Sequence, residues 1–413
     1  MACRPRAALG AALASVLLAA SAHAAPPFVE SDDVLFRLGG YARNLSGLQL
    51  LPVSDADAAA LGLPTESALS ATVLRLEWRL DLGRRVTIDL HQRLFLQVTS
   101  EPGTNTALGV GTTLAPDRSL DLQTTIAESD TLRLDHDIDR LSVRVYLPSA
   151  DLAIGRQAIT WGTSLLFTTS DVWAAFSPYD LDTSQKRGID AVRLITQLGE
   201  RVELDLVLAD RGSLADLSGG ARATFYLGSA DLYLAAAKVW DELSLMAGVA
   251  AAVGSFKLRA EANLPWSLDA DALQTPRATL GADWFGPDIV LTLEAHLGGT
   301  GTAHKDRYLQ HALQNEPLNR GEVYLLGRWY AGAAASWKPM PLLTLSLSAL
   351  ANLQDPSLLL APRVAWEVSA DVSLALGAFS GLGAHPEALP TPSLGSEFGS
   401  FGHLIYLELA AFF

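Results

Sequence analysis

The chain has almost no cysteine. Among its 413 residues only Cys3 carries a thiol, and it lies close to the N-terminus. The rest of the chain therefore excludes disulfides, thiolate metal sites and a cysteine nucleophile. Export without cysteine is compatible with the cell envelope, although it does not select a compartment.

The chain also lacks long apolar runs and an excess of positive charge. Hydrophobic residues make up 49% of the sequence, yet beyond the N-terminal segment no run approaches the roughly 18 apolar residues of a membrane helix. The formal net charge is −15, with 45 acidic and 30 basic residues. This balance argues against broad binding of nucleic acid or anionic lipid. So apolar a chain must bury its hydrophobic surface in another way.

The N-terminus has the features of an export signal. Arg4 and Arg6 precede a short apolar stretch, which ends in the small-residue sequence Ala-His-Ala at 22–24. This order is typical of a cleaved secretory signal peptide. We therefore predict a signal peptide over residues 1–24 and one mature domain over residues 25–413. An N-terminal membrane anchor is the alternative, and the short apolar core disfavours it.

Period-two alternation dominates the rest of the sequence. Leu74, Leu76 and Trp78 alternate with Arg75 and Glu77, and the same pattern recurs at residues 202–208 and 256–263. Successive side chains of a strand take opposite faces, so each such segment has one apolar and one polar face. A soluble sandwich alternates as well, so the connections must decide the fold.

Short and long connections between the predicted strands alternate along most of the chain. The expected short ones are residues 81–84, 148–150, 198–200, 228–230, 286–287 and 337–341. The expected long ones are residues 44–70, 99–139, 158–187, 264–276, 297–321 and 381–402. Short periplasmic turns and long extracellular loops are typical of outer-membrane barrels.

The pattern predicts an all-β fold, a transmembrane antiparallel β-barrel of about 18 strands, with 16 as the alternative count. It runs from residues 34–43 to residues 403–413. Hydrocarbon cannot satisfy free backbone N–H and C=O groups, so strands cross it only as a closed barrel. Outer-membrane lipid would surround the wall, and a homo-oligomer remains open. Aromatic girdles are expected from Trp240, Trp284, Phe285, Trp329, Tyr330 and Trp337.

The last strand ends in an aromatic residue. Ile405, Leu407, Leu409, Ala411 and Phe413 alternate on one face. A terminal aromatic that closes an alternating strand resembles the assembly signal of outer-membrane barrels. The resemblance implies the barrel-assembly machinery as a partner through Phe413; a chance terminal Phe on a soluble protein is the alternative.

One stretch is more specific than the strand pattern. Residues 155–162 read GRQAITWG, and Asp171-Val172, Pro178 and the sequence RGIDAVR at 187–193 follow. This resembles the GRQ-x-I-x-WG … GxDAVR motif of poorly characterised proteobacterial porin-like outer-membrane proteins. Residues 173–176 read WAAF where the family has an Asn-Pro-Phe-like element, so details of that loop do not carry over. The motif residues are Gly155, Arg156, Gln157, Trp161, Gly162, Gly188 and Asp190.

Arg156 conflicts with the lipid-facing phase of its strand. Leu152 and Ile154 alternate outward, and Arg156 would follow them. A charge on the lipid face costs roughly 2–4 kcal/mol at mid-bilayer and about 0–1 kcal/mol near the interface. We therefore expect Arg156 at the extracellular rim or turned inward by a bulge.

The loop after this strand is unusually aromatic. It carries Trp161, Phe167, Trp173, Phe176 and Tyr179. Such a loop is too apolar to extend freely into water. We predict that it folds against the inside of the barrel wall and narrows the lumen.

Alternation assigns the charged residues to the lumen. Pore-lining candidates are Arg75, Arg79, Asp89, His91, Arg93, Arg144, Glu203, Asp205, Lys257, Arg259, Glu261 and Glu294. Arginines dominate the earlier strands, and acids are more common in the later ones. We predict a wall of Arg75, Arg79, Arg93 and Arg144 that attracts anions, opposed by Glu203, Asp205 and Glu261. A mutually neutralised, plugged lumen is the alternative.

Motifs for chemistry are missing. The sequence has no G-x-S-x-G elbow, no H-E-x-x-H and no P-loop. His304 and His311 flank Asp306, but such a set is more often solvated than metal-binding. No metal, cofactor or enzymatic activity is predicted. The predicted function is passive diffusion of small hydrophilic solutes; the alternatives are a barrel that scaffolds or sheaths an envelope transport or electron-transfer complex, and an outer-membrane hydrolase.

Overall fold

The computed structural model describes residues 29–31, 33–62, 64–102, 118–167, 169–175, 185–213, 216–388 and 391–413. The predicted signal peptide, Phe176 and Tyr179 lie outside these residues. None of the helices in the described ranges is long and apolar enough to cross a bilayer.

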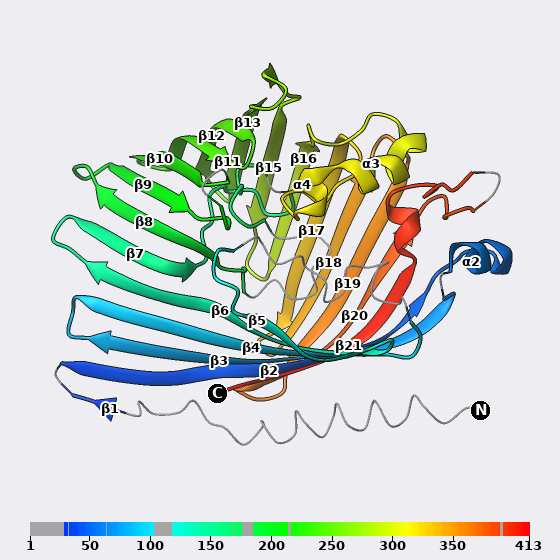
Figure 1. The fold of residues 1–413 in the computed structure, drawn as a ribbon, viewed down its shortest axis with the longest axis horizontal. Helices are drawn as coiled ribbons and strands as arrows, with labels where there is room; N and C mark the ends of the chain where they lie inside the picture. The colour runs from blue at the N-terminus through cyan, green and yellow to red at the C-terminus, as the bar shows by residue number, and fades with distance from the viewer. Residues whose placement is uncertain are drawn as a thin grey trace.

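The described strands form one closed antiparallel barrel of 18 wall strands (Figure 1). The first wall strand pairs with the last, and this pairing closes the sheet. The predicted fold class is confirmed. The wall strands are β2 (Val34–Leu50), β3 (Glu66–Leu82), β4 (Val86–Thr99), β6 (Leu132–Tyr146), β7 (Ala150–Gln157), β8 (Ile189–Gln197), β9 (Val202–Ala209), β10 (Ser218–Leu227), β11 (Ala230–Val239), β12 (Glu242–Val253), β13 (Phe256–Ser267), β15 (Arg277–Phe285), β16 (Ile289–Leu297), β17 (Trp329–Met340), β18 (Leu343–Asn352), β19 (Ser357–Glu367), β20 (Val372–Leu382) and β21 (His403–Phe412).

Smaller elements decorate this wall. Three short strands add to its ends: β1 (Val29–Glu30), β5 (Gln123–Ser129) and β14 (Ala272–Leu273). The helices are α2 (Asp55–Leu61), η1 (Lys305–Arg307), α3 (Tyr308–Gln314), α4 (Glu316–Asn319) and η2 (Phe398–Phe401). All of these helices lie in connections at the same end of the barrel, which we call the loop end.

The two ends of the barrel differ as the sequence predicts. The turn end carries only short connections: residues 83–85, 147–149, 198–201, 228–229, 254–255, 286–288, 341–342 and 368–371. The loop end carries the long ones: residues 51–65, 100–131, 158–188, 298–328 and 383–402. Some strands run further toward the loop end than expected. The connection predicted at residues 44–70 is only residues 51–65, because β2 and β3 stay paired up to Leu50 and Glu66.

The outer face is a belt of exposed apolar side chains. Alternation directs leucines outward from the neighbouring strands, among them Leu206, Leu234, Leu258, Leu280, Leu293, Leu347 and Leu376. Exposed aromatic residues lie at both edges of the belt. Trp266 and Trp329 lie toward the loop end, and Phe256, Trp337 and Trp366 lie toward the turn end.

Two residues expected in the girdles lie elsewhere, so that prediction is wrong for them. Tyr330 alternates with outward Trp329 and is buried inside the barrel. Trp240 lies in the two-residue turn between β11 and β12, and its ring packs under the guanidinium groups of Arg211 and Arg320. A position close to a strand end therefore does not decide which face an aromatic residue takes.

A β-bulge changes the phase of β6. His91 pairs with Arg140 and Gln92 pairs with Ile138, so Asp139 has no partner across the β4–β6 ladder. One inserted residue moves the following side chains to the opposite face. Asp139 and Arg140 are consequently both buried, although they are adjacent in sequence.

Arg156 lies at the loop end of β7, away from the apolar outer belt. The preceding Gly155 has a φ of +110°, and the exposure falls from 50% at Ile154 to 1% at Arg156. The Arg156 guanidinium donates to the carbonyls of Ile138 (2.8 Å) and Leu120. Of the two expected positions, the structure therefore shows the rim, where protein groups satisfy the charge.

Gly155 is expected to be intolerant of any side chain. A Cβ there would lie 2.2 Å from the Leu141 carbonyl oxygen, whereas Gly212 has a similar φ of +101° and open space around it. Gly155→Ala and Gly212→Ala share the backbone cost of a positive φ, about 1–2 kcal/mol, and only the first adds a clash. Urea unfolding of the barrel in detergent should show a clearly larger loss of stability for Gly155→Ala. Equal losses would contradict the role of the close approach.

Candidate functional site

The connection from β7 to β8 enters the barrel with its first residues. Its described first part, residues 158–167 and 169–175, which we call the inner loop, runs along the inner face of the wall. Near its start, Trp161 donates from Nε1 to Asp205 of β9 at 2.8 Å. Further on, Phe167 packs over Gly332 of β17. The inner loop thus lines the wall from β9 to β17.

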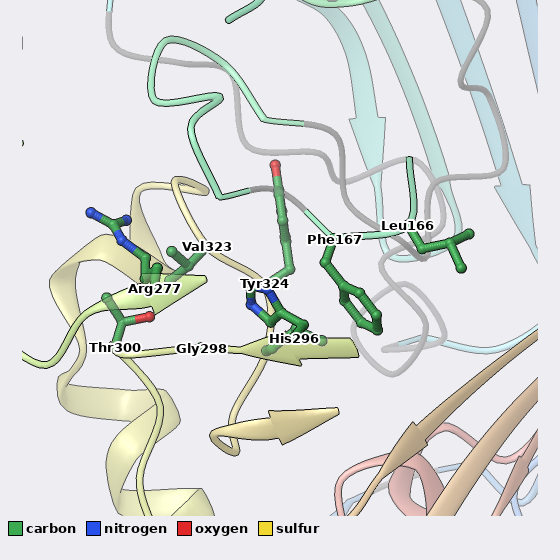
Figure 2. Close-up of a pocket in the computed structure, with 9 residues that line it drawn as sticks. Leu166, Phe167, Arg277, His296, Gly298, Thr300, Val323 and Tyr324 are labelled. Atoms are coloured by element: carbon green, nitrogen blue, oxygen red, sulfur yellow. The ribbon is translucent and has the colours of Figure 1, made fainter. Parts of the chain in front are cut away.

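Aromatic side chains hold the inner loop against the wall. Trp161 and Trp173 form an edge-to-face pair with ring centres 5.1 Å apart. Both are buried in one cluster with Ile159, Ile189 and inward side chains of β9, β11 and β12. Phe167 stacks on His296 of β16 with ring centres 4.9 Å apart. Figure 2 shows these two side chains beside each other. The apolar side chains of the loop therefore face the wall instead of water.

Figure 2 also shows the residues that surround Phe167. A small pocket remains where the inner loop meets the end of β16 and the connection of residues 298–328. Its lining includes Leu166, Arg277 and Tyr324. Tyr324 donates to the Ala175 carbonyl at 3.0 Å, which joins this connection to the inner loop.

Two carboxylates of the wall bind the backbone of the inner loop. Glu261 of β13 accepts the amides of Thr163 and Ser164, the latter at 3.1 Å. Glu294 of β16 accepts the next three amides, those of residues 165, 166 and 167, at 2.8, 2.9 and 3.1 Å. Buried carboxylates require such donors, and bonds to a charged acceptor are among the strongest in proteins. Five consecutive amides are thereby fixed by two side chains.

Arg259 completes this anchor. It donates to the Thr163 carbonyl at 2.7 Å, and it lies 2.7 Å from Asp283 and 3.1 Å from Glu294. Arg259 and Glu261 are each 4% exposed. Their prediction as pore-lining residues is therefore wrong, because the inner loop covers them. Alternation identifies the face of a strand correctly but cannot show what lies on that face.

The motif residues join the two ends of the connection. Arg156 donates to both carboxylate oxygens of Asp190 at 2.8 and 3.0 Å. The Gly188 amide donates to Asp139 at 3.2 Å, and Gln157 donates to the Ala191 carbonyl at 3.1 Å. The GRQ and GID parts of the motif thus hold the last residues of β7 beside the first residues of β8.

The other two motif residues fix the start of the inner loop. Trp161 anchors it to β9, and Gly162 adopts a φ of +100° beside the Glu261 carboxylate. Further along, Lys186 forms an ion pair with Asp171 at 2.5 Å. The motif residues in this structure therefore hold the loop in place, and none of these contacts indicates a substrate.

The arginines expected to attract anions differ in their availability. Arg75 is 1% exposed and bonds to Asp139 at 2.7 Å and to Glu77 at 2.8 Å. Its assignment to a pore-lining wall is wrong, because these acids neutralise it below the surface. Arg79 is exposed and lies 3.1 Å from Asp81. Arg93 and Arg144 are partly exposed.

The remaining candidates also divide into covered and accessible groups. Asp205 is fully buried between Arg193 and Trp161, so it is not a pore-lining residue either. Glu203 is partly exposed and accepts from Gln197 at 2.9 Å. Asp89 is half-buried and Lys257 is exposed. The expected separation into a basic and an acidic wall is therefore weaker than the sequence indicates.

A second buried site joins the long connections. Glu397, at the start of η2, accepts from the Leu326 amide at 2.9 Å, Asn352 at 2.7 Å and the Tyr330 hydroxyl at 2.5 Å. These contacts bind residues 383–402 to residues 298–328 and to the wall. Burial raises the pKa of Glu397 to about 7. Sequence analysis missed this site, because a single acid in a loop follows no periodicity.

No metal site is evident in the part of the chain that the structure describes, since no three His, Cys, Asp or Glu side chains converge there. His304 and His311 lie on different sides of η1. The His311 ring lies 2.9 Å from the side-chain amide of Asn315, the residue that ends α3.

Comparison with known proteins identifies the fold only. No family model and no curated protein matches the chain. Solved porins share its architecture: OccAB2 of Acinetobacter baumannii has 10% identity and a TM-score of 0.55, and OccK9 (OpdG) of Pseudomonas aeruginosa has 11% identity and a TM-score of 0.54. Each match covers 92% of this chain and 98% of the other. OpdK of Pseudomonas aeruginosa, solved with vanillate, gives 10% identity, a TM-score of 0.52 and the same coverage.

Removal of the Glu294 carboxylate should release the loop amides that it binds. In Glu294→Ala, residues 165–167 lose three charge-assisted hydrogen bonds, each worth roughly 1.5–3 kcal/mol. Hydrogen exchange read by mass spectrometry should show faster exchange of these amides by at least about tenfold. Glu203→Ala, a lumenal carboxylate without contact to the inner loop, is the control. Unchanged protection in Glu294→Ala would refute the anchor.

Glu397 should make stability depend on pH. Its pKa is about 7 in the folded protein, against 4.5 for an ordinary glutamate. Glu397 therefore contributes roughly 3 kcal/mol at most to the free energy of unfolding. This contribution is fully present below about pH 4.5 and is lost as the pH rises through about 7. Urea unfolding at pH 5.5 and 8.5 should show lower stability at pH 8.5, and Glu397→Gln should show a smaller difference. An equal difference in both proteins would assign the pH dependence to other groups.

Proposed function

We propose that this chain is an outer-membrane, porin-like channel for passive diffusion of small hydrophilic solutes. The observation that carries the proposal is a closed barrel with an apolar outer belt, a charged interior and a connection folded inward. A bilayer accepts strands only in this closed form, because every backbone group is then paired within the protein. The short connections would face the periplasm and the long ones the cell exterior.

The inner loop would set the width of the passage. It covers the wall from β9 to β17, so a solute passes between the loop and the opposite strands β2 to β4, β20 and β21. No chemical step is required, since selectivity in such channels follows from diameter and from lumenal charge. Many inward acids and bases of the described chain are engaged in anchoring contacts, which leaves these groups unavailable for a chemical step.

Partners of the barrel belong to the same proposal. The last residue is bound to the first wall strand, since Phe413 exchanges backbone hydrogen bonds with Gly40 at 3.0 and 2.9 Å. We propose that the assembly machinery of the outer membrane acts on this terminal strand, and that lipid contacts the apolar belt. Association of several barrels through the belt is compatible with its apolar surface.

Deletion of the inner loop tests both the channel and its constriction. The protein with residues 161–175 replaced by a short Gly-Ser linker should show larger single-channel conductance in a planar bilayer than the wild-type barrel, because the passage widens. A heat-modifiable band on electrophoresis confirms that the deleted barrel folds. Equal conductance would refute the constriction, and a folded wild-type barrel without discrete current steps would refute the channel.

A further inference from the structure

Arg93 is a lumenal cation that has no acidic partner among the described residues. It lies on β4, and its guanidinium lies 4.8 Å from the centre of the Phe95 ring. Across the described ranges of the chain, no carboxylate lies within ion-pair distance of Arg93. A partly exposed arginine on an aromatic face keeps its planar N–H groups available for a ligand.

The charges beside Arg93 are already satisfied. Asp137 lies opposite it on β6, and Arg118 donates to both oxygens of that carboxylate at 2.9 and 3.0 Å. Arg75 lies opposite it on β3 and is bound to Asp139. The neighbouring acids therefore have other partners, and no described residue compensates the charge of Arg93.

Arg187 adds to the positive potential at this place. It belongs to the end of the connection that carries the inner loop. Burial, followed by the positive charges of Arg93 and Arg118, lowers the pKa of Arg187 to about 10. Asp137 and Asp139 act in the opposite direction on Arg187. The mutual repulsion places Arg187 within electrostatic reach of Arg93, so it adds to the potential that an anion at Arg93 meets.

An exposed apolar side chain lies on the opposite side of the lumen. β4 is the third of the 18 wall strands, and the strand diametrically across the ring is the twelfth, β15. The inner loop is bound to the strands on both sides of β15, through Glu261 and Glu294. There the Leu165 side chain is 66% exposed. The passage thus has a guanidinium on one side and a leucine on the other.

We propose that Arg93 binds the carboxylate of a small organic anion in transit, whose apolar body passes on the side of Leu165. The planar fork of an arginine matches a carboxylate with two parallel hydrogen bonds. A halide offers neither this geometry nor an apolar body. The inference rests on the proposed channel function and names its solute class.

Benzoate is a suitable probe, and its binding is measurable without any current. Calorimetry on the detergent-solubilised barrel should detect benzoate binding to the wild-type protein. Arg93→Gln should weaken it about tenfold or more, and Arg93→Lys should weaken it less, because the charge remains without the fork. Lys257→Gln, which removes an exposed lumenal charge elsewhere, should change it by less than about twofold. Leu165→Ala should weaken benzoate more than acetate.

The outcomes separate this inference from the channel proposal. Equal benzoate affinity in Arg93→Gln and wild type, or no benzoate binding to the wild type, overturns the anion site. Equal competition by chloride and benzoate overturns the carboxylate class. Planar-bilayer recordings of the same preparation decide the channel independently: a silent barrel that still binds benzoate through Arg93 refutes transport and supports the site.

Discussion

The structure depends on complete pairing of backbone polar groups. Eighteen strands satisfy one another only because β2 and β21 meet and remove the two free edges that an open sheet would have. Closure in turn fixes two surfaces of opposite character, since alternation directs leucines outward and charged residues inward from the same strands. The same requirement continues inside the barrel, where the amides of the inner loop have no strand partner and bind carboxylates instead.

The need to pair the amides of the inner loop also organises the interior of the barrel. Glu261 and Glu294 would be unfavourable as bare charges beneath a loop, and five loop amides would be unfavourable without acceptors. Each set satisfies the other. For the proposed transport, the number of lumenal charges is therefore a poor guide to the charge that a solute meets. Arg75, Asp205 and Arg259 are engaged in structural ion pairs, whereas Arg93 has no such partner among the described residues.

Much of the fold is readable in the sequence because membrane and lumen impose a strict period of two. The charged strands 74–80 and 256–263 show it without ambiguity, and the alternation of short and long connections gives the strand count. Residues 44–50 contain no charge to mark the polar face, so their place in β2 was not predictable. The position of the inserted residue, Asp139, becomes visible only in the pairing of β6 with β4, where the register shifts by one residue.

The candidate site was predictable only in part, for a similar reason. An aromatic loop must find an apolar surface, and Trp161, Phe167 and Trp173 are buried accordingly. Which carboxylates bind the loop amides depends on the path of the loop along the wall. Glu294 is separated by 127 to 129 residues in sequence from the amides that it binds. No local pattern encodes such a contact. The pairing of Arg156 with Asp190, in contrast, links two parts of a motif that the sequence already presents together.

The inner loop also has a mechanical consequence. The Arg156–Asp190 pair and Gly188 hold the two ends of the β7–β8 connection, and β9, β13, β16 and β17 hold the inner loop along its length. It therefore acts as an internal rib across nearly half of the circumference. A thin cylinder flattens easily under lateral pressure, whereas a ribbed one flattens only if the amide–carboxylate bonds break. In the proposed channel, the size limit for solutes should accordingly stay constant when the tension of the surrounding membrane changes.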